Sequence, residues 1–303
     1  MGGDARMPRA IVLCAALSAA VSIPASGAPE RSASAPDLSG NWAHPFLTGF
    51  EPPASGPGPV LNTSRRPDGV ANFQQLVGDH TNPILKPHAA EIVKKHGEMS
   101  RSGVGYPTPS NQCRPQGVPY IFWDFTMQFL PSADHITMVY RQGNETRRIR
   151  MNQPHPQMVK PSWYGDSVGR YEGDTLVIDT IGVKVGPYPM LDMYGTPFSE
   201  KLHVVERYRL VDYEEAKDEI DRNVKENSNP MGNGAAIDHN YRGKMLQLHF
   251  TVEDENVFTT PWTATITYWP NLQGWPEQIC AENPREYYNN KDTDLPVADK
   301  PDF

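Results

Sequence analysis

Residues 154–180 carry a high density of side chains capable of acid–base chemistry. His155 lies between two prolines, and Tyr164, Asp166 and Ser167 follow on a glycine-flanked turn that runs into a strand pattern. Because proline and glycine restrict the backbone here, we expect these polar groups to be held in place. Histidine changes charge near neutral pH, so His155 is a candidate general base, with Tyr164 or Asp166 as its partner. The alternative is a surface-loop imidazole hydrogen-bonded to backbone.

Ser167 is the centre of a Gly-X-Ser-X-Gly pattern formed with Gly165 and Gly169. In hydrolases with this motif the serine sits on a sharp turn from a strand into a helix. The segment after Ser167 has the pattern of a strand instead, which argues against a serine nucleophile. We therefore take Ser167 as a substrate-binding candidate.

Glu206 is the most informative carboxylate outside this segment, because its strand pattern places it among apolar side chains. It shares one strand face with Val204, Tyr208 and Leu210. A buried carboxylate must be paired or have a raised pKa, and a raised pKa suits a general acid or base. Glu206 is therefore either catalytic or a structural ion-pair partner of an arginine inside the sheet, such as Arg114, Arg148 or Arg150.

Several further residues are candidates for binding a substrate. Arg114 is an alternative to Glu206 for stabilising a substrate charge. Aromatic residues near the suspected site include Trp123, Trp163 and Tyr194. They favour a small apolar or aromatic molecule as ligand, if they line a cavity. Ordinary core packing of a sheet protein is the alternative explanation for most of them.

No motif for a metal or nucleotide cofactor is found in the sequence. The histidines form no His-X-X-X-His or His-X-His pair, and no Cys-X-X-Cys pair exists. Neither a phosphate-binding loop nor a Gly-X-Gly-X-X-Gly pattern occurs. We expect no cofactor and no metal, although a metal site assembled from distant residues leaves no signal in residue spacing.

The amino terminus has the layout of a secretory signal peptide over residues 1–27. Arginines precede an apolar run from Ile11 to Ile23, and small residues follow it. That run is shorter than the roughly 20 residues that span a bilayer. We therefore expect a periplasmic or secreted protein without membrane insertion. Removing the leader leaves Cys113 and Cys280 as the only cysteines in an oxidising compartment, which predicts a disulfide between them.

The charge of the chain argues against some classes of binding partner. The formal net charge is −8, and no cluster of lysine and arginine occurs. Nucleic acid and anionic membrane surfaces are therefore poor partners, and a small molecule is the better expectation. The sequence does not determine the oligomeric state.

The pattern of apolar residues predicts an all-β protein with a few short helices. Residues 28–37 form a flexible lead-in, and 38–283 form one domain. From residue 118 apolar residues alternate with polar ones in short runs separated by turns. This favours a mainly antiparallel sheet, either a lipocalin-like barrel or a sandwich.

Helical spacing is confined to two places. Residues 86–99 predict a short amphipathic helix with Ala89, Ile92, Val93 and His96 on one face, and His96 near solvent at its end. Residues 212–240 predict a helix and loop inserted between strands. This insertion is either a lid over a barrel mouth or a helix docked on the outside of the sheet. Residues 284–303 read as a polar tail.

Several motifs in order resemble one large family of exported bacterial proteins rich in β-structure. They are the Cys-Arg-Pro-X-Gly-Val-Pro run from Cys113, the segment from Pro154 to Thr180, Glu-Arg-Tyr-Arg at Glu206, Pro-Trp-Thr at Pro261 and Cys-Ala-Glu-Asn at Cys280. The resemblance runs through nearly the whole chain after the leader. It implies a shared fold and export, and it transfers no activity.

These observations favour an exported enzyme that uses acid–base chemistry without a cofactor: a lyase, isomerase or hydrolase. The alternatives are a binding protein for a hydrophobic small molecule and a structural or interaction protein of the cell envelope. An enzyme of the predicted kind requires His155 and Glu206 to face one cavity. A binding protein requires only the cavity.

Overall fold

The computed structural model describes residues 2, 35–45, 47–103, 105–227, 237–238, 240–271 and 274–275, with side chains left out for 223–227. The described residues from 35 onward belong to one compact unit. The predicted signal peptide, the tail at 284–303, most of the lead-in and the loop of the insertion lie outside the described residues.

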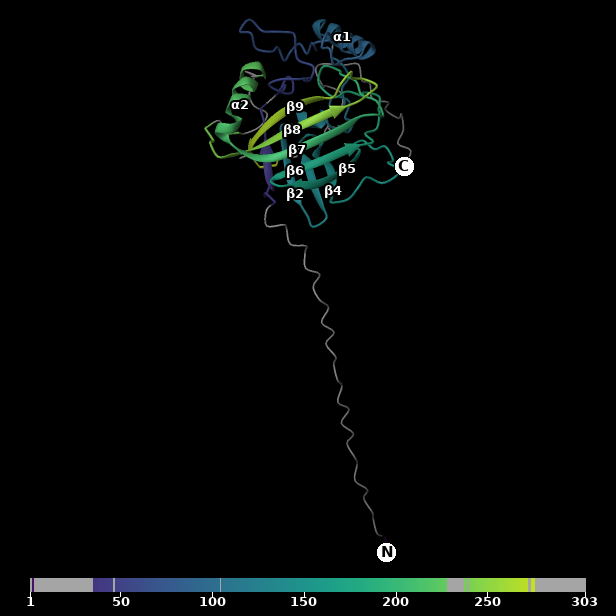
Figure 1. Ribbon diagram of the computed structural model, residues 1–303, viewed down its shortest axis with the longest axis vertical. Helices are drawn as coiled ribbons and strands as arrows, with labels where there is room; N and C mark the ends of the chain where they lie inside the picture. The colour runs from purple at the N-terminus through teal and green to yellow at the C-terminus, as the bar shows by residue number, and fades with distance from the viewer. Residues whose placement is uncertain are drawn as a thin grey trace. The chain divides into compact units, whose positions relative to one another are not determined.

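Nine strands close into a barrel in the order of the chain (Figure 1). They are β1 (Gly40–Ala43), β2 (Thr126–Pro131), β3 (His135–Tyr140), β4 (Glu145–Met151), β5 (Asp166–Glu172), β6 (Thr175–Ile181), β7 (His203–Asp212), β8 (Lys244–Glu253) and β9 (Trp262–Pro270). Neighbouring strands are antiparallel except β4 and β5, which are parallel. The predicted all-β fold is confirmed, and of the two architectures left open the chain forms the barrel.

Alternation along the strands separates the barrel interior from its outer face. On β8, Leu246, Leu248, Phe250 and Val252 are at most 1% exposed and belong to the main core. On β7, Glu206 lies opposite Phe250 in the register, so its side chain is directed into the same interior. The period of two in the sequence therefore predicts correctly that these residues of β7 and β8 face inward.

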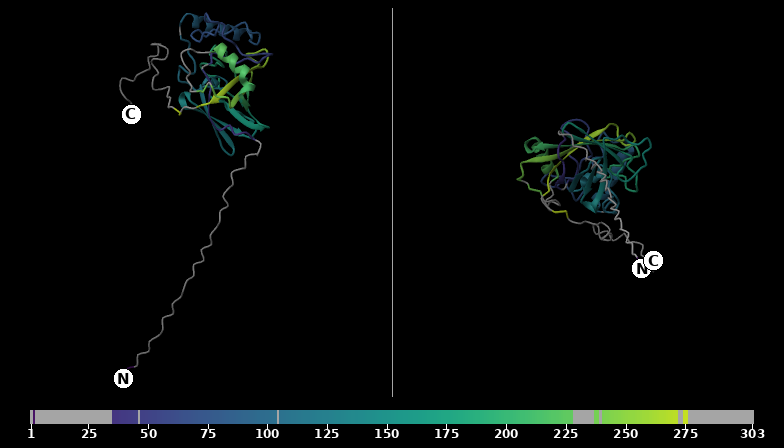
Figure 2. Two further views of the ribbon diagram at one scale, coloured as in Figure 1. Left: turned by 90° about the vertical axis from the view of Figure 1, so that its left-hand side faces the viewer. Right: turned by 90° about the horizontal axis from the view of Figure 1, so that it is seen from below.

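Two α-helices accompany the barrel: α1 (Pro87–Arg101) at one end, and α2 (Tyr213–Asn227) along β7, β8 and β9 (Figures 1 and 2). Ala216 and Ile220 of α2 pack on Val211, Met245 and Trp269 in a small core outside the barrel. Of the two interpretations of the insertion, α2 fits the helix docked on the outside of the sheet. Two 3-10 turns, Tyr120–Trp123 and Gln142–Asn144, complete the regular structure of the described residues.

The prediction for α1 is partly wrong. Ala89, Val93 and His96 are buried at spacings of four and three residues, whereas Ile92, one position from Val93, is 38% exposed. His96 is only 3% exposed, and its ring lies against that of Tyr106, with 4.1 Å between ring centroids. It is therefore a core histidine, and its burial lowers its pKa to about 4.

The loop between the parallel strands β4 and β5 contains most of the predicted chemistry. Residues 152–165 return from the end of β4 to the start of β5, which places Ser167 beside Ile149. The loop ends at Gly165, whose φ is +71°. A Cβ there would lie 2.7 Å from the Ile181 carbonyl oxygen, so the turn requires glycine. Asp166 and Ser167, the next two residues, then point to opposite sides of the barrel wall.

Candidate functional site

The barrel interior contains a buried ion pair. Glu206 is fully buried and accepts a hydrogen bond of 2.8 Å from the Arg147 guanidinium, which is itself 1% exposed. The same guanidinium donates to Ser167 Oγ at 3.0 and 3.1 Å and to Thr180 Oγ1 at 2.6 Å. The Tyr208 hydroxyl donates to Glu206 at 3.1 Å. These contacts satisfy both charges, which is what a buried ion pair needs in order to be tolerated.

This network supports the structural interpretation of Glu206 but with a different arginine. Arg148 and Arg150 occupy the alternate positions of β4 and face outward, and Arg114 is exposed on a loop. Arg147 is the inward residue between them. Ser167, predicted to bind substrate, is 4% exposed beneath the guanidinium. It is held as an acceptor inside the wall.

His155 and Asp166, two of the predicted catalytic residues, do meet, but on the outer face of the barrel. His155 Nδ1 lies 2.6 Å from Asp166 Oδ1, and Arg150 bonds the same carboxylate at 2.7 and 3.0 Å. The other ring nitrogen of His155 lies 2.9 Å from Asp179 Oδ1, which also contacts His203 Nε2 at 3.1 Å. We call His155, Asp166, Asp179, His203 and Arg150 the outer clasp, because it ties the 152–165 loop to four strands.

The barrel wall separates the outer clasp from Glu206, so the predicted convergence of His155 and Glu206 does not occur. On β6, Asp179 faces outward while its neighbour Thr180 contacts Arg147 inside. The imidazole of His155 has carboxylate partners at both nitrogens, and its side chain is 21% exposed. Such double pairing fits a structural contact better than a general base, which needs an accessible nitrogen for a substrate proton.

The outer clasp is expected to make stability depend on pH. The hydrogen bond from His203 lowers the pKa of Asp179, and the same bond raises the pKa of His203. The Asp179 contribution is lost as pH falls through its lowered pKa, and that of His203 is lost as pH rises through its raised pKa. Asp179→Asn is therefore expected to cost about 1 kcal/mol near pH 6 and less at either extreme.

Thermal unfolding of Asp179→Asn and wild type from pH 3 to pH 9 measures this difference. Asp174→Asn is the control, because Asp174 is an exposed turn residue whose carboxylate accepts a hydrogen bond from the neighbouring Thr175 hydroxyl and lies outside the outer clasp. A constant difference between Asp179→Asn and wild type across this range would contradict the assignment.

A cavity of about 530 Å³ lies where β4 begins, beside the loop that contains Arg114. Glu145, the first residue of β4, lines this cavity together with Tyr164 and Arg114. The backbone N–H of Gln116 donates to Glu145 Oε2 at 2.9 Å, and the Tyr164 hydroxyl donates to the same carboxylate. We call Glu145, Tyr164 and Arg114 the acid–base group.

Burial shifts the pKa values of ionisable side chains at this cavity. It raises the pKa of Glu145 to about 7, and the charge of Asp124 contributes in the same direction. Burial also raises the pKa of Tyr164, so its hydroxyl keeps its proton and stays a donor. Asp124 lies behind the Gln142–Asn144 turn, is 3% exposed, and has a pKa raised to about 7 by burial. A carboxyl that titrates near neutral pH in a cleft is a recognised mark of an active site.

The structure thus brings two predicted residues, Tyr164 and Arg114, to a carboxylate that was not among the candidates from the sequence. Two arginines follow Glu145 closely on β4, but Arg147 pairs with Glu206, and Arg148 contacts His135 at 3.3 Å. A signal for Glu145 did exist, because it shares the inward parity of Arg147, Ile149 and Met151 on β4.

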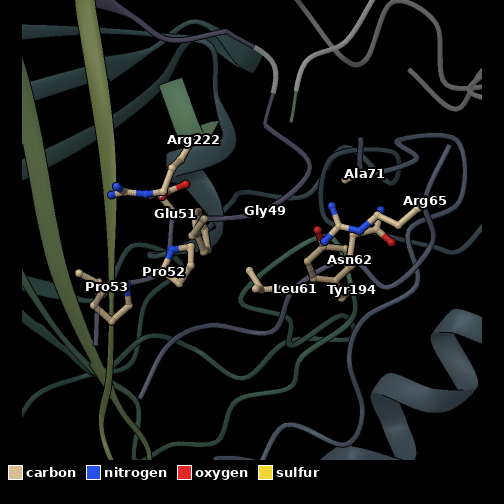
Figure 3. A pocket seen from close by; sticks show the side chains of 12 residues that line it. Gly49, Glu51, Pro52, Pro53, Leu61, Asn62, Arg65, Ala71, Tyr194 and Arg222 are labelled. Atoms are coloured by element: carbon tan, nitrogen blue, oxygen red, sulfur yellow. The ribbon is translucent and has the colours of Figure 1, made fainter. Parts of the chain in front are cut away.

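The predicted aromatic residues do not form one cavity. Trp123 is 8% exposed and packs in the main core, with 5.5 Å between its ring centroid and that of Phe50. Trp163 lies under Lys184, whose Nζ is 4.8 Å from the ring centroid, beside a crevice of only about 20 Å³. Tyr194 is buried and borders a different cavity (Figure 3). Core packing accounts for Trp123, and none of the three lines the cavity at Glu145.

Cys113 is disulfide-bonded. Its predicted partner Cys280 lies outside the described residues, so the pairing itself stays a prediction.

Comparisons with protein-family models, curated proteins and solved structures found no match. Within the described part of the chain, no three or more histidine, cysteine, aspartate or glutamate side chains are arranged to hold a metal ion. None of the helices described here has the length and apolar character needed to cross a bilayer.

Proposed function

We propose that this chain is an exported enzyme that catalyses proton transfer on a small molecule without a cofactor, as a lyase, isomerase or hydrolase. The observation that carries the proposal is Glu145, a carboxyl with a pKa near 7 in a cavity of about 530 Å³. Near neutral pH it is present in both protonation states, so one group can take a proton and return it. The signal-peptide pattern of residues 1–27 supports export.

The neighbours of Glu145 suit the rest of such a reaction. Tyr164 keeps its proton and can hydrogen-bond an oxygen that becomes negative in the transition state. Arg114 is exposed at the cavity, where its guanidinium can bind a substrate carboxylate or an enolate oxygen. The roles first considered for His155 and Glu206 thus pass to Glu145.

The cavity also favours a particular substrate class. Several of its lining side chains are polar, among them Gln116, Gln142, Asn144 and Thr146, and two of them, Arg114 and Glu145, are ionisable. We therefore propose a small carbonyl acid, whose carboxylate meets Arg114 and whose acidic C–H faces Glu145. The sequence favours a small apolar or aromatic molecule, and the arginine and glutamate at this cavity favour one that also carries a charge.

Hydrogen–deuterium exchange tests the proposal. The protein is incubated in D₂O with a panel of 2-oxo and 3-oxo carboxylic acids, and loss of the C–H signal next to the carbonyl is followed by NMR. We expect wild type to accelerate exchange of at least one acid, and Glu145→Gln to lose about 100-fold or more of that rate. The rate of exchange should change around pH 7, because the fraction of protein molecules with an ionised Glu145 changes there.

Glu98→Gln, a change of the same kind on the exposed face of α1, is the matched control and should exchange like wild type. Exchange no faster than in buffer with every acid, or undiminished exchange by Glu145→Gln, would disprove the proposal. The alternative function is a non-catalytic binding protein. The cavity at the acid–base group would suit ligand binding equally well. Binding of an acid without any exchange in wild type would favour that alternative.

A further inference from the structure

The Gln142–Asn144 turn forms one side of the cavity at Glu145, and all three of its residues line that cavity. The Glu145 side chain lies against this turn, because a Cβ added to Gly143 would be 3.8 Å from Glu145 Oε1. A polar group carried by the turn can therefore contact the same bound molecule as the Glu145 carboxyl.

The backbone of the turn is held at both ends. The N–H of Gln142 donates to Asp124 Oδ2 at 2.6 Å, and the N–H of Asn144 donates to the Arg141 carbonyl at 3.2 Å. Asn144 has a left-handed φ of +50°, which asparagine adopts more readily than most residues. The turn therefore fixes where the half-buried Asn144 side chain meets the cavity.

A tryptophan from the segment after β9 fixes the orientation of the Asn144 amide. Trp275 Nε1 lies 2.9 Å from Asn144 Oδ1. An indole nitrogen can only donate, so the amide oxygen must face it, and the amide nitrogen with its two N–H donors is turned away from it. Among the residues that the structure describes, this nitrogen has no hydrogen-bond acceptor of its own.

A fixed amide donor at the edge of a cavity suits an uncharged oxygen of a ligand. The other uncharged donor of the acid–base group, the Tyr164 hydroxyl, already donates to Glu145 in the free protein. The Asn144 amide can bind a carbonyl oxygen without giving up a protein partner. Because its orientation is already set, little side-chain freedom is lost when the ligand binds.

We propose that Asn144 determines specificity for the oxo group of the substrate, by donating a hydrogen bond from its side-chain amide to the substrate carbonyl oxygen. Trp275 is the positioning residue, because its indole holds the amide in the donating orientation. The inference rests on the proposed function, which places a carbonyl acid in this cavity. It assigns the carbonyl to Asn144 and leaves the carboxylate to Arg114.

Isothermal titration calorimetry with 2-oxopentanoate, 3-oxopentanoate and pentanoate tests the assignment. These acids share a carboxylate and a chain length and differ in the carbonyl. We expect wild type to bind the better of the two oxo acids about 10-fold more tightly than pentanoate, which is the size of one hydrogen bond. Asn144→Gly keeps a residue suited to left-handed φ and changes no charge. It should reduce this preference to about 2-fold or less and leave pentanoate affinity unchanged.

Asn152→Gly is the matched control. Asn152 also has a left-handed φ, of +55°, but it is exposed and does not line the cavity. The preference for the oxo acid should therefore stay at the wild-type value in Asn152→Gly. Far-ultraviolet circular dichroism checks that each variant is folded.

Trp275→Phe tests the positioning role, because it keeps an aromatic ring and removes the N–H donor. We expect it to lower the preference about 3-fold in wild type and to have no further effect in Asn144→Gly, since it acts through the amide. An equal loss of affinity for pentanoate and the oxo acids in both backgrounds would contradict this role.

Absence of any preference in wild type at millimolar concentration, or an undiminished preference in Asn144→Gly, would overturn the inference. The exchange assay separates it from the proposed reaction. Glu145-dependent exchange with an undiminished preference in Asn144→Gly would refute only the role of Asn144. A preference that is lost in Asn144→Gly, without exchange in wild type, would support that role and refute the reaction.

Discussion

Glu206→Gln is expected to lower the free energy of unfolding by about 3–5 kcal/mol, because it leaves the Arg147 guanidinium buried without its counter-charge. Arg147 is 1% exposed, and its other partners, Ser167 and Thr180, are neutral hydroxyls. Removing one member of a buried pair costs more than removing both. We therefore expect Arg147→Met combined with Glu206→Gln to recover part of the loss.

Urea unfolding of the two single variants and the double variant measures the coupling between these side chains. Glu200→Gln, a change of the same kind at an exposed position, should stay within about 0.5 kcal/mol of wild type. The hydrogen–deuterium exchange assay, run on Glu206→Gln beside its unfolding curve, addresses the catalytic interpretation of Glu206. Lost activity at unchanged stability in Glu206→Gln would contradict the structural role argued here.

Asp124→Asn is expected to stabilise the protein at pH 8 and to leave it nearly unchanged at pH 4. Asp124 is 3% exposed, and burial raises its pKa to about 7, well above the value of an unfolded chain. A raised carboxyl pKa contributes stability that is fully present below the unfolded pKa and is lost as pH rises to the folded one. Over that window the loss is on the order of 3–4 kcal/mol.

Denaturant unfolding at pH 4, 6 and 8 measures the difference between Asp124→Asn and wild type. An asparagine oxygen can still accept the hydrogen bond of 2.6 Å from the Gln142 backbone N–H, so the change removes mainly the charge. The exposed turn variant Asp68→Asn carries no burial cost and should show no gain at pH 8. Equal destabilisation of Asp124→Asn at every pH would refute this account.

Much of the barrel can be predicted from local pattern. The period of two assigns Leu248 and Phe250 of β8 to the interior, as observed, and it places Glu206 among them. On β4 the sequence interpretation offered Arg148 and Arg150 as interior arginines, whereas the structure places Arg147 inside and both of them outside. The period of two does not determine which interior residue meets Glu206, because β4 and β7 are not neighbours in the sheet. Their side chains meet across the interior only when the barrel closes.

The residues of the candidate site could be predicted only in part, because they too come from separate parts of the chain. Tyr164 and Arg114 are recognisable as polar residues on constrained loops, and the structure places both at one cavity. Glu145 has the inward parity of its strand, yet its raised pKa depends on burial by the 110–116 loop and on Asp124 behind the turn. Those neighbours come from separate parts of the chain, so residue spacing does not reveal them.

Sequence alone determined the class of the fold, the inward faces of β7 and β8 and the constrained His155 loop, because alternation, glycine and proline act on neighbouring residues. The tertiary structure alone decided that His155 and Glu206 lie on opposite sides of one wall. It also decided that Glu145, Tyr164 and Arg114 share a cavity. The physical reason is that adjacent residues on a strand face opposite sides, so the polar groups of one segment are divided between interior and surface. The order of the strands and the closure of the barrel then determine which polar side chains meet.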